Sequence, residues 1–165
     1  MGIFDWLFGK KDTPYLTNIE DDKTKNVEKN GIHVVYYENG QLELKGNFVD
    51  GKMEGPFQRY YENGQLQLEV NYKNDLMDGL YKDYYENGKL ESEGNYKDDN
   101  TEGLWKYYNE NGRLMFEQNF KDGKPEGLHK KYYDNGQLEM EGKYKNGEII
   151  SEKFWDENGK EIECE

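Results

Sequence analysis

The sequence predicts an all-β fold, namely a repeat solenoid built as one elongated, single-layer antiparallel β-meander. The first observation is the Asn-Gly pair, which recurs every 24 residues from Asn39-Gly40 to Asn135-Gly136, with a sixth at Asn158-Gly159. The second is that aromatic and leucine positions keep the same 24-residue phase. The third is the complete absence of Ala, the best helix former, from a chain rich in Tyr. Together they indicate about five and a half β-hairpin units.

Composition alone would suggest disorder, because Leu, Ile, Val and Phe make up less than a fifth of the 165 residues and the net charge is −13. Two observations contradict that interpretation. Aromatic residues form 15% of the chain, including 15 Tyr, and they recur at fixed spacing.

The negative charge disfavours nucleic acid and anionic membranes as main partners, since both require a basic surface.

Residues 1–30 are predicted to form an N-terminal apolar segment and a polar lead-in, separate from the repeat domain. Ile3, Phe4, Leu7 and Phe8 lie at helical spacing, with Trp6 beside them. Residues 1–9 could dock on the sheet near Gly31–Tyr37 or on a membrane, and the net charge favours the protein surface. No secretory signal and no apolar run long enough to span a membrane is evident, which indicates a cytoplasmic protein.

The repeat domain is predicted to span residues 31–165, with each unit beginning at a glycine. The five full units are Gly31–Glu54, Gly55–Asp78, Gly79–Glu102, Gly103–Glu126 and Gly127–Ile150, and a truncated sixth is Ser151–Glu165. Each Asn-Gly pair predicts a type I′ turn, which demands positive φ at both central residues. In the second unit the paired strands are Phe57–Tyr61 and Leu66–Tyr72. Segments such as Asp50-Gly51-Lys52 form the second turn, which leads to the next hairpin.

The pattern from Gly79 to Leu90, continuing through Glu93-Gly94-Asn95-Tyr96, resembles the MORN repeat and most closely its bacterial variant form. The resemblance covers about residues 31–160. It implies a repeat scaffold, and bacterial chains built mainly of such repeats are grouped as YwqK-like antitoxins, which implies protein binding without catalysis. The sequence departs from the pattern at Val70 and Gln118, where other units have glycine, and this predicts a different twist or local surface there.

Two rows of acidic residues are predicted at the two ends of the strands. One row precedes every Asn-Gly turn and consists of Glu38, Glu62, Glu86, Glu110 and Asp134. The other precedes every repeat glycine and consists of Glu54, Asp78, Glu102 and Glu126. Either row could steer a basic partner, and the alternative is that both are solvated turn residues that keep the sheet soluble.

Aromatic residues form the second candidate binding surface. Tyr61, Tyr85 and Tyr133 recur with Trp105 on the same side of the first strands, and tyrosine is favoured at interfaces. The alternative is that these rings form the sheet's own cross-strand ladders. His33 and His129 are four periods apart in an aromatic position, so we interpret them as structural residues and not as an acid–base pair.

The sequence therefore predicts a non-catalytic protein-binding module of antitoxin or immunity type, with a basic partner protein. No nucleophile motif, phosphate-binding loop or metal-binding spacing is present, so no cofactor or metal is expected. The candidate partner-binding residues are Glu38, Glu62, Glu86, Glu110, Asp134, Tyr61, Tyr85, Trp105 and Tyr133. The alternative function is a structural or assembly scaffold, peripherally attached to a membrane through residues 1–9. The sequence does not indicate the oligomeric state.

Overall fold

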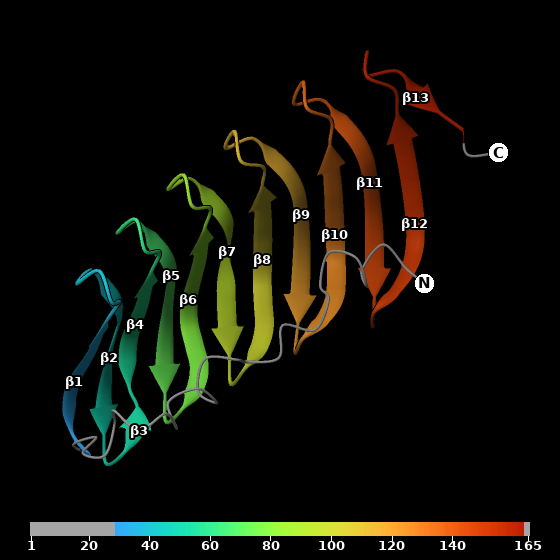
Figure 1. Cartoon of the computed structure of the whole chain (residues 1–165). Helices are drawn as coiled ribbons and strands as arrows, with labels where there is room; N and C mark the ends of the chain where they lie inside the picture. The colour runs from blue at the N-terminus through green and yellow to red at the C-terminus, as the bar shows by residue number, and fades with distance from the viewer. Residues whose placement is uncertain (1–28, 164–165) are drawn as a thin grey trace.

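The computed structural model describes residues 29–163, so the predictions on residues 1–9 lie outside the described residues. The described chain is one antiparallel sheet whose strands follow the chain order, apart from the short β3, which pairs with β2 (Figure 1). The strands are β1 (Gly31–Tyr36), β2 (Leu42–Val49), β3 (Lys52–Met53), β4 (Gly55–Tyr60), β5 (Leu66–Lys73), β6 (Leu76–Tyr84), β7 (Leu90–Lys97), β8 (Asn100–Tyr108), β9 (Leu114–Lys121), β10 (Lys124–Tyr132), β11 (Leu138–Lys145), β12 (Glu148–Trp155) and β13 (Glu161–Ile162).

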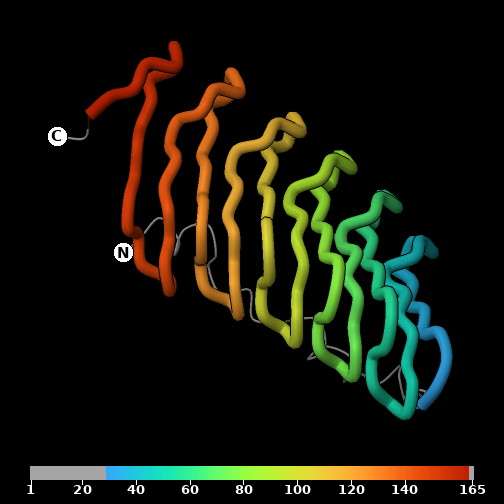
Figure 2. The backbone as a smooth tube through the Cα atoms, turned by 180° about the vertical axis from the view of Figure 1, so that it is seen from behind, coloured from blue at the N-terminus to red at the C-terminus, as the bar shows by residue number. Residues whose placement is uncertain are grey.

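The predicted single-layer meander is confirmed. Seen from behind, the backbone is a row of hairpins with all Asn-Gly turns along one edge and the connecting turns along the other (Figure 2). Substantial contacts are confined to neighbouring strands. The predicted strand Phe57–Tyr61 corresponds to β4 and Leu66–Tyr72 to β5, while later first strands begin before the repeat glycine, as β6 does at Leu76.

The prediction of type I′ turns at the Asn-Gly pairs is wrong. Only the glycines there have positive φ, for example +79° at Gly88, whereas Asn87 does not. The Gly88 N–H donates to the Tyr85 carbonyl (2.8 Å) and the Tyr85 N–H to the Lys89 carbonyl (2.9 Å). This is a three-residue loop, in which a type I turn is followed by a left-handed glycine.

The positive-φ pairs occur at the opposite edge of the sheet. Asn74 (φ 50°) and Asp75 (φ 71°) form one such turn, and Asp98 with Asp99 forms the next. Asn and Asp tolerate the left-handed region better than other non-glycine residues. The two edges of the sheet are therefore closed by different turns, and both turns fix the 24-residue period.

We predict that Gly88→Val destabilises the protein by about 1–3 kcal/mol, because a β-branched residue at φ +79° is strained. Lys89→Ala is the matched control, since Lys89 is exposed and adjacent to the turn. Urea denaturation followed by circular dichroism measures both. Equal midpoints for the two variants would contradict the turn geometry.

One face of the sheet, here called the aromatic face, carries the core. Met53, Phe57, Leu68 and Val70 form a buried cluster, and Leu44, Phe48, Tyr72, Met77 and Tyr81 pack against it. Farther along, Trp105 contacts the rings of Tyr81, Tyr96, Tyr107 and Phe120. Because side chains alternate along a strand, these rings cover the sheet from one side, without a second layer.

Glycines on the second strands make room for these rings. The ring of Trp105 lies so close to Gly94 that an ideal Cβ there would be 2.3 Å from the indole carbons. Val70 and Gln118 occupy the equivalent positions in the second and fourth units and are fully buried. The expected local surface at these two departures from the repeat is therefore not found, because both side chains fill the interior.

The opposite face, here called the polar face, carries ladders of paired charges and tyrosines. Lys106 Nζ lies 3.9 Å from Glu117 Oε1, and Lys130 Nζ lies 3.4 Å from Glu141 Oε2. Tyr108 donates to Glu93 and Tyr132 to Glu117, both at 2.9 Å. Burial and then these hydrogen bonds raise the pKa of each tyrosine to about 12. Both hydroxyls therefore remain protonated donors at neutral pH.

Candidate protein-binding edge

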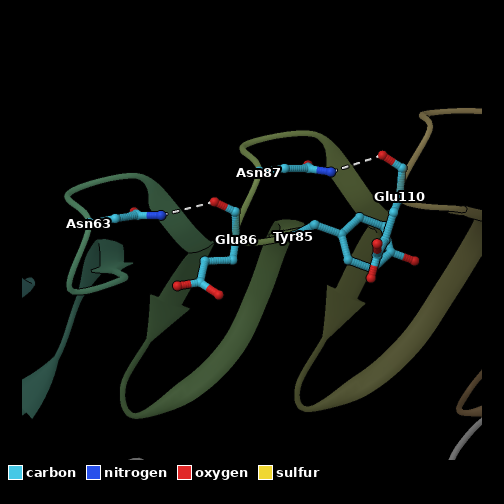
Figure 3. A pocket seen from close by; sticks show the side chains of 5 residues that line it. All are labelled: Asn63, Tyr85, Glu86, Asn87 and Glu110. Atoms are coloured by element: carbon cyan, nitrogen blue, oxygen red, sulfur yellow. Dashed lines mark hydrogen bonds between the residues drawn. The ribbon is translucent and has the colours of Figure 1, made fainter.

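The Asn-Gly turns are linked to one another along the edge of the sheet. The Asn63 amide donates to the Glu86 carbonyl (3.0 Å), and the Asn87 amide donates to the Glu110 carbonyl (2.9 Å; Figure 3). Asn39 and Asn135 donate to the next turns in the same way. Glu62, Glu86 and Glu110 are thus held by their main-chain carbonyls, while their carboxylates are left free of this ladder.

The carboxylates of this row are exposed. Glu38, Glu62, Glu86, Glu110 and Asp134 all lie at the surface. Among the described residues, no ion pair within 4 Å includes any of the five. The structure therefore brings this predicted row together as a line of exposed carboxylates.

Tyrosine hydroxyls form a second ladder below the turns. Tyr61 donates to the Tyr84 carbonyl, Tyr85 to the Tyr108 carbonyl and Tyr133 to the Trp155 carbonyl, each at 2.7 Å. Burial, followed by nearby carboxylates, raises the pKa of Tyr61, Tyr85 and Tyr133. These rings are half-buried. Part of each ring packs on the sheet, and only the remaining surface is accessible to a partner.

An open groove lies between consecutive turns. A groove of about 430 Å³ is lined by Asn63, Tyr85, Glu86, Asn87 and Glu110 (Figure 3). It places the carboxylates of two successive turns and one tyrosine ring around the same space. A cationic side chain would meet negative charge and an aromatic ring there.

The ladder changes in the fourth unit, which sequence reasoning missed. Asn109 stands where the other units have tyrosine, and its amide contacts the Asp134 carboxylate at 3.4 Å. The guanidinium of Arg113 donates to the main-chain carbonyl of Asp134. The signal was present in the sequence, because Asn109 interrupts the series Tyr37, Tyr61, Tyr85 and Tyr133.

The placement of Trp105 on an open binding surface is wrong. Trp105 is only 3% exposed, and its indole N–H donates to the Asn95 carbonyl at 3.1 Å. The physical reason is the close approach to Gly94, which lets the ring lie against β7 while neighbouring rings close over it. Trp105 therefore belongs to the core.

The second acidic row is also not a free surface. The carboxylates of Glu54, Glu102 and Glu126 accept the N–H groups of Asn74, Asp122 and Asn146, at 2.9, 3.1 and 2.7 Å. Each carboxylate thus stabilises the turn that lies 20 residues later in the sequence. These three carboxylates are therefore engaged within the sheet, whereas those of the Asn-Gly row lie exposed at the surface.

His33 and His129 occupy equivalent positions opposite Gly46 and Gly142, in β1 and β10. His129 is 2% exposed and packs against Tyr144 and Phe116. Burial lowers its pKa, although Glu152 and Glu141 oppose that shift. The two imidazoles are separated along the sheet and do not share a site.

We predict that His129 makes stability depend on pH. Its pKa is lower in the folded state than the unfolded value of about 6.5, so the unfolded state binds more protons in the interval between them. The contribution is complete above about pH 6.5 and is lost as the pH falls. Urea midpoints at about pH 7.5 and 5.5 should differ less in His129→Phe than in the parent. An unchanged difference would contradict the prediction.

Within residues 29–163 no helix is long and apolar enough to cross a membrane. The same described range contains no group of three or more His, Cys, Asp or Glu side chains that could hold a metal ion.

The model of the MORN repeat variant matches residues 29–50, 53–74, 77–98, 101–122 and 125–146, which together cover two thirds of the chain. The chain belongs to the MORN repeat variant family. Each matched segment contains one Asn-Gly turn, so the MORN repeats coincide with the hairpins seen in the structure. No curated protein matches the sequence.

Two solved structures are similar to this MORN chain at low sequence identity. One is S. aureus TarM, a mutant in complex with fondaparinux, alpha-GlcNAc-glycerol and UDP, at 9% identity and a TM-score of 0.38. A second TarM crystal structure has 10% identity and a TM-score of 0.37. The alignments cover 58% and 59% of the present chain and 19% of each TarM chain.

Proposed function

We propose that this MORN repeat chain is a non-catalytic, cytoplasmic binding module of the antitoxin or immunity type, and that its partner is a basic protein. The observation that carries the proposal is the Asn-Gly edge, where five acidic side chains are exposed and the asparagine ladder holds the main chain of three of them, Glu62, Glu86 and Glu110, in line. A net charge of −13 adds long-range attraction for a basic partner.

The repeat sets the spacing that a partner must match. Consecutive turns are two strands apart, which is about 10 Å at the usual strand separation. Basic side chains at every seventh residue of a helix have nearly the same spacing. Each groove then receives one lysine or arginine between two carboxylates and beside a tyrosine ring.

Arg113 supports this assignment of ligand chemistry. Its guanidinium extends from one Asn-Gly turn to the next, where it donates to the main-chain carbonyl of Asp134. The chain's own arginine thus places a guanidinium between consecutive turns, although its acceptor there is a carbonyl and not a carboxylate.

The test compares two variants with the same change in net charge. The edge variant carries Glu62→Gln, Glu86→Gln, Glu110→Gln and Asp134→Asn. The control variant carries Asp50→Asn, Asp98→Asn, Asp122→Asn and Glu148→Gln at the opposite edge, where Asn already occurs at the equivalent positions 74 and 146. Both sets of side chains are exposed, so both variants are expected to fold.

Proteins captured from the native host by the full chain are identified by mass spectrometry, and affinity for the captured protein is then measured by calorimetry. We expect a basic partner, with affinity at least tenfold lower for the edge variant than for the control variant. A neutral or acidic partner, or equal loss in both variants, would refute the proposal.

A further inference from the structure

A row of exposed apolar side chains crosses the polar face near the end of the strands that is remote from the Asn-Gly turns. This leucine row consists of Ile32, Pro56, Leu80, Leu104 and Leu128, one from each first strand. Ile32, Leu80, Leu104 and Leu128 are 64%, 38%, 42% and 47% exposed, and Pro56 is also at the surface. Each is adjacent in sequence to a residue of the aromatic face, so alternation places the row on the polar face.

Asparagines lie between the leucines, and two of them, Asn47 and Asn119, direct their amides to main-chain carbonyls of the sheet. Asn95 is the cross-strand partner of Leu80, and Asn119 is that of Leu104. Asn119 donates to the Leu128 carbonyl and Asn47 to the Glu54 carbonyl, both at 3.1 Å. The row therefore presents alkyl groups about 10 Å apart over a total of about 40 Å.

The chain itself holds a matching apolar segment. Residues 3–8 contain Ile3, Phe4, Trp6, Leu7 and Phe8. The described chain begins at Lys29, whose carbonyl accepts the Gly51 N–H at 2.7 Å, and Ile32 follows three residues later. The N-terminal segment therefore joins the sheet at the first member of the row.

The intervening length is sufficient to reach the row. Twenty residues separate Phe8 from Lys29. A chain of that length spans at most about 66 Å, with a root-mean-square separation of about 25 Å for a freely coiled chain. Leu80, in the middle of the row, lies about 20 Å from Ile32 by strand spacing. Tethering at such separations gives an effective concentration in the millimolar range.

Net charge favours the N-terminal segment as the group that covers the row, over a membrane surface or a second copy of the chain. A net charge of −13 repels an anionic membrane surface, and two copies of the chain repel each other. The strip of the polar face beside the row alternates Glu93, Glu117 and Glu141 with Lys82, Lys106 and Lys130, so its charges balance and it does not repel the segment.

We propose that residues 3–8 bind in cis to the leucine row. The segment then covers the polar face of its own sheet, and the acidic edge with the Asn-Gly turns stays open. This inference is independent of the identity of any partner.

The test uses the full chain with Cys164→Ser and Asp5→Cys, which leaves one cysteine for a nitroxide label. We expect the label to broaden the amide signals of β6, β8 and β10 near Leu80, Leu104 and Leu128. The broadening should be lost with Leu80→Glu and Leu104→Glu together. It should persist with Ile149→Glu and Ile150→Glu, which alter two equally exposed residues outside the row.

Three results would overturn the proposal. The broadening could be absent or confined to β1, it could survive the double substitution in the row, or it could arise only between labelled and unlabelled chains in a mixture. If the sheet signals stay sharp while the chain sediments with vesicles of phosphatidylserine and phosphatidylcholine, the segment serves a membrane and the proposal fails. The amide spectrum of each variant verifies that the sheet is folded.

Discussion

Trp105→Ala is expected to lower the free energy of unfolding by about 3–5 kcal/mol. The indole is 3% exposed and contacts the rings of Tyr81, Tyr96, Tyr107 and Phe120. Its N–H also donates to the Asn95 carbonyl, so truncation leaves a cavity and an unpaired acceptor. A single-layer sheet has no second layer that could move in to fill the space, which places the cost toward the upper end.

Leu104→Ala is the matched control, because Leu104 precedes Trp105 and is 42% exposed on the other face. Urea denaturation of the two variants and the parent, followed by circular dichroism, gives the comparison. Similar losses in both would mean that the aromatic face does not carry the core.

Gly94→Val is expected to cost about 3 kcal/mol, at the upper end of the range for an overpacked core. The ideal Cβ at this position would lie 2.3 Å from two indole carbons of Trp105, a distance at which one group must shift. Asn95→Val is the control, because it adds the same β-branched side chain one residue along the strand, on the exposed face.

The double variant Gly94→Val with Trp105→Ala tests the cause directly. If the valine clashes with the indole, the space left by Trp105→Ala accommodates the valine. The double variant then loses less free energy of unfolding than the sum of the two single losses. Strict additivity would show that Gly94 is required for another reason.

The fold could be predicted from the sequence because the same signals return in every unit. One hairpin gives a weak signal, but Leu66, Leu68, Val70 and Tyr72 alternate just as their counterparts do in the other units. The turn type could not be predicted in this way. Asn-Gly suits both a type I′ turn and a type I turn followed by a left-handed glycine, and the φ of Asn87 and the hydrogen bonds of Tyr85 distinguish them.

The candidate site was predicted in part for a similar reason. The sequence placed acidic residues at both ends of the strands but could not tell which were engaged. Glu54 and Glu86 are the same residue type at equally regular positions. The carboxylate of Glu54 accepts an N–H from the next turn, whereas in Glu86 it is the carbonyl that accepts. Which oxygen is used depends on three-dimensional contacts between units 20 or more residues apart. The burial of Trp105 depends on Gly94 in the same way.

Strands contact mainly their immediate neighbours. The number of hairpins can therefore change without altering the contacts inside each hairpin. Duplicating 24 residues in phase would insert one more hairpin and extend the edge by about 10 Å, without disturbing the rings on either side. Inserting about 12 residues, which is half a period, would instead place an Asn-Gly turn at the opposite edge of the sheet. The strands at that edge are joined by a two-residue turn of a different type. Gene duplication can thus fit the number of acidic turns to the length of a partner, while the stability of each internal junction stays the same.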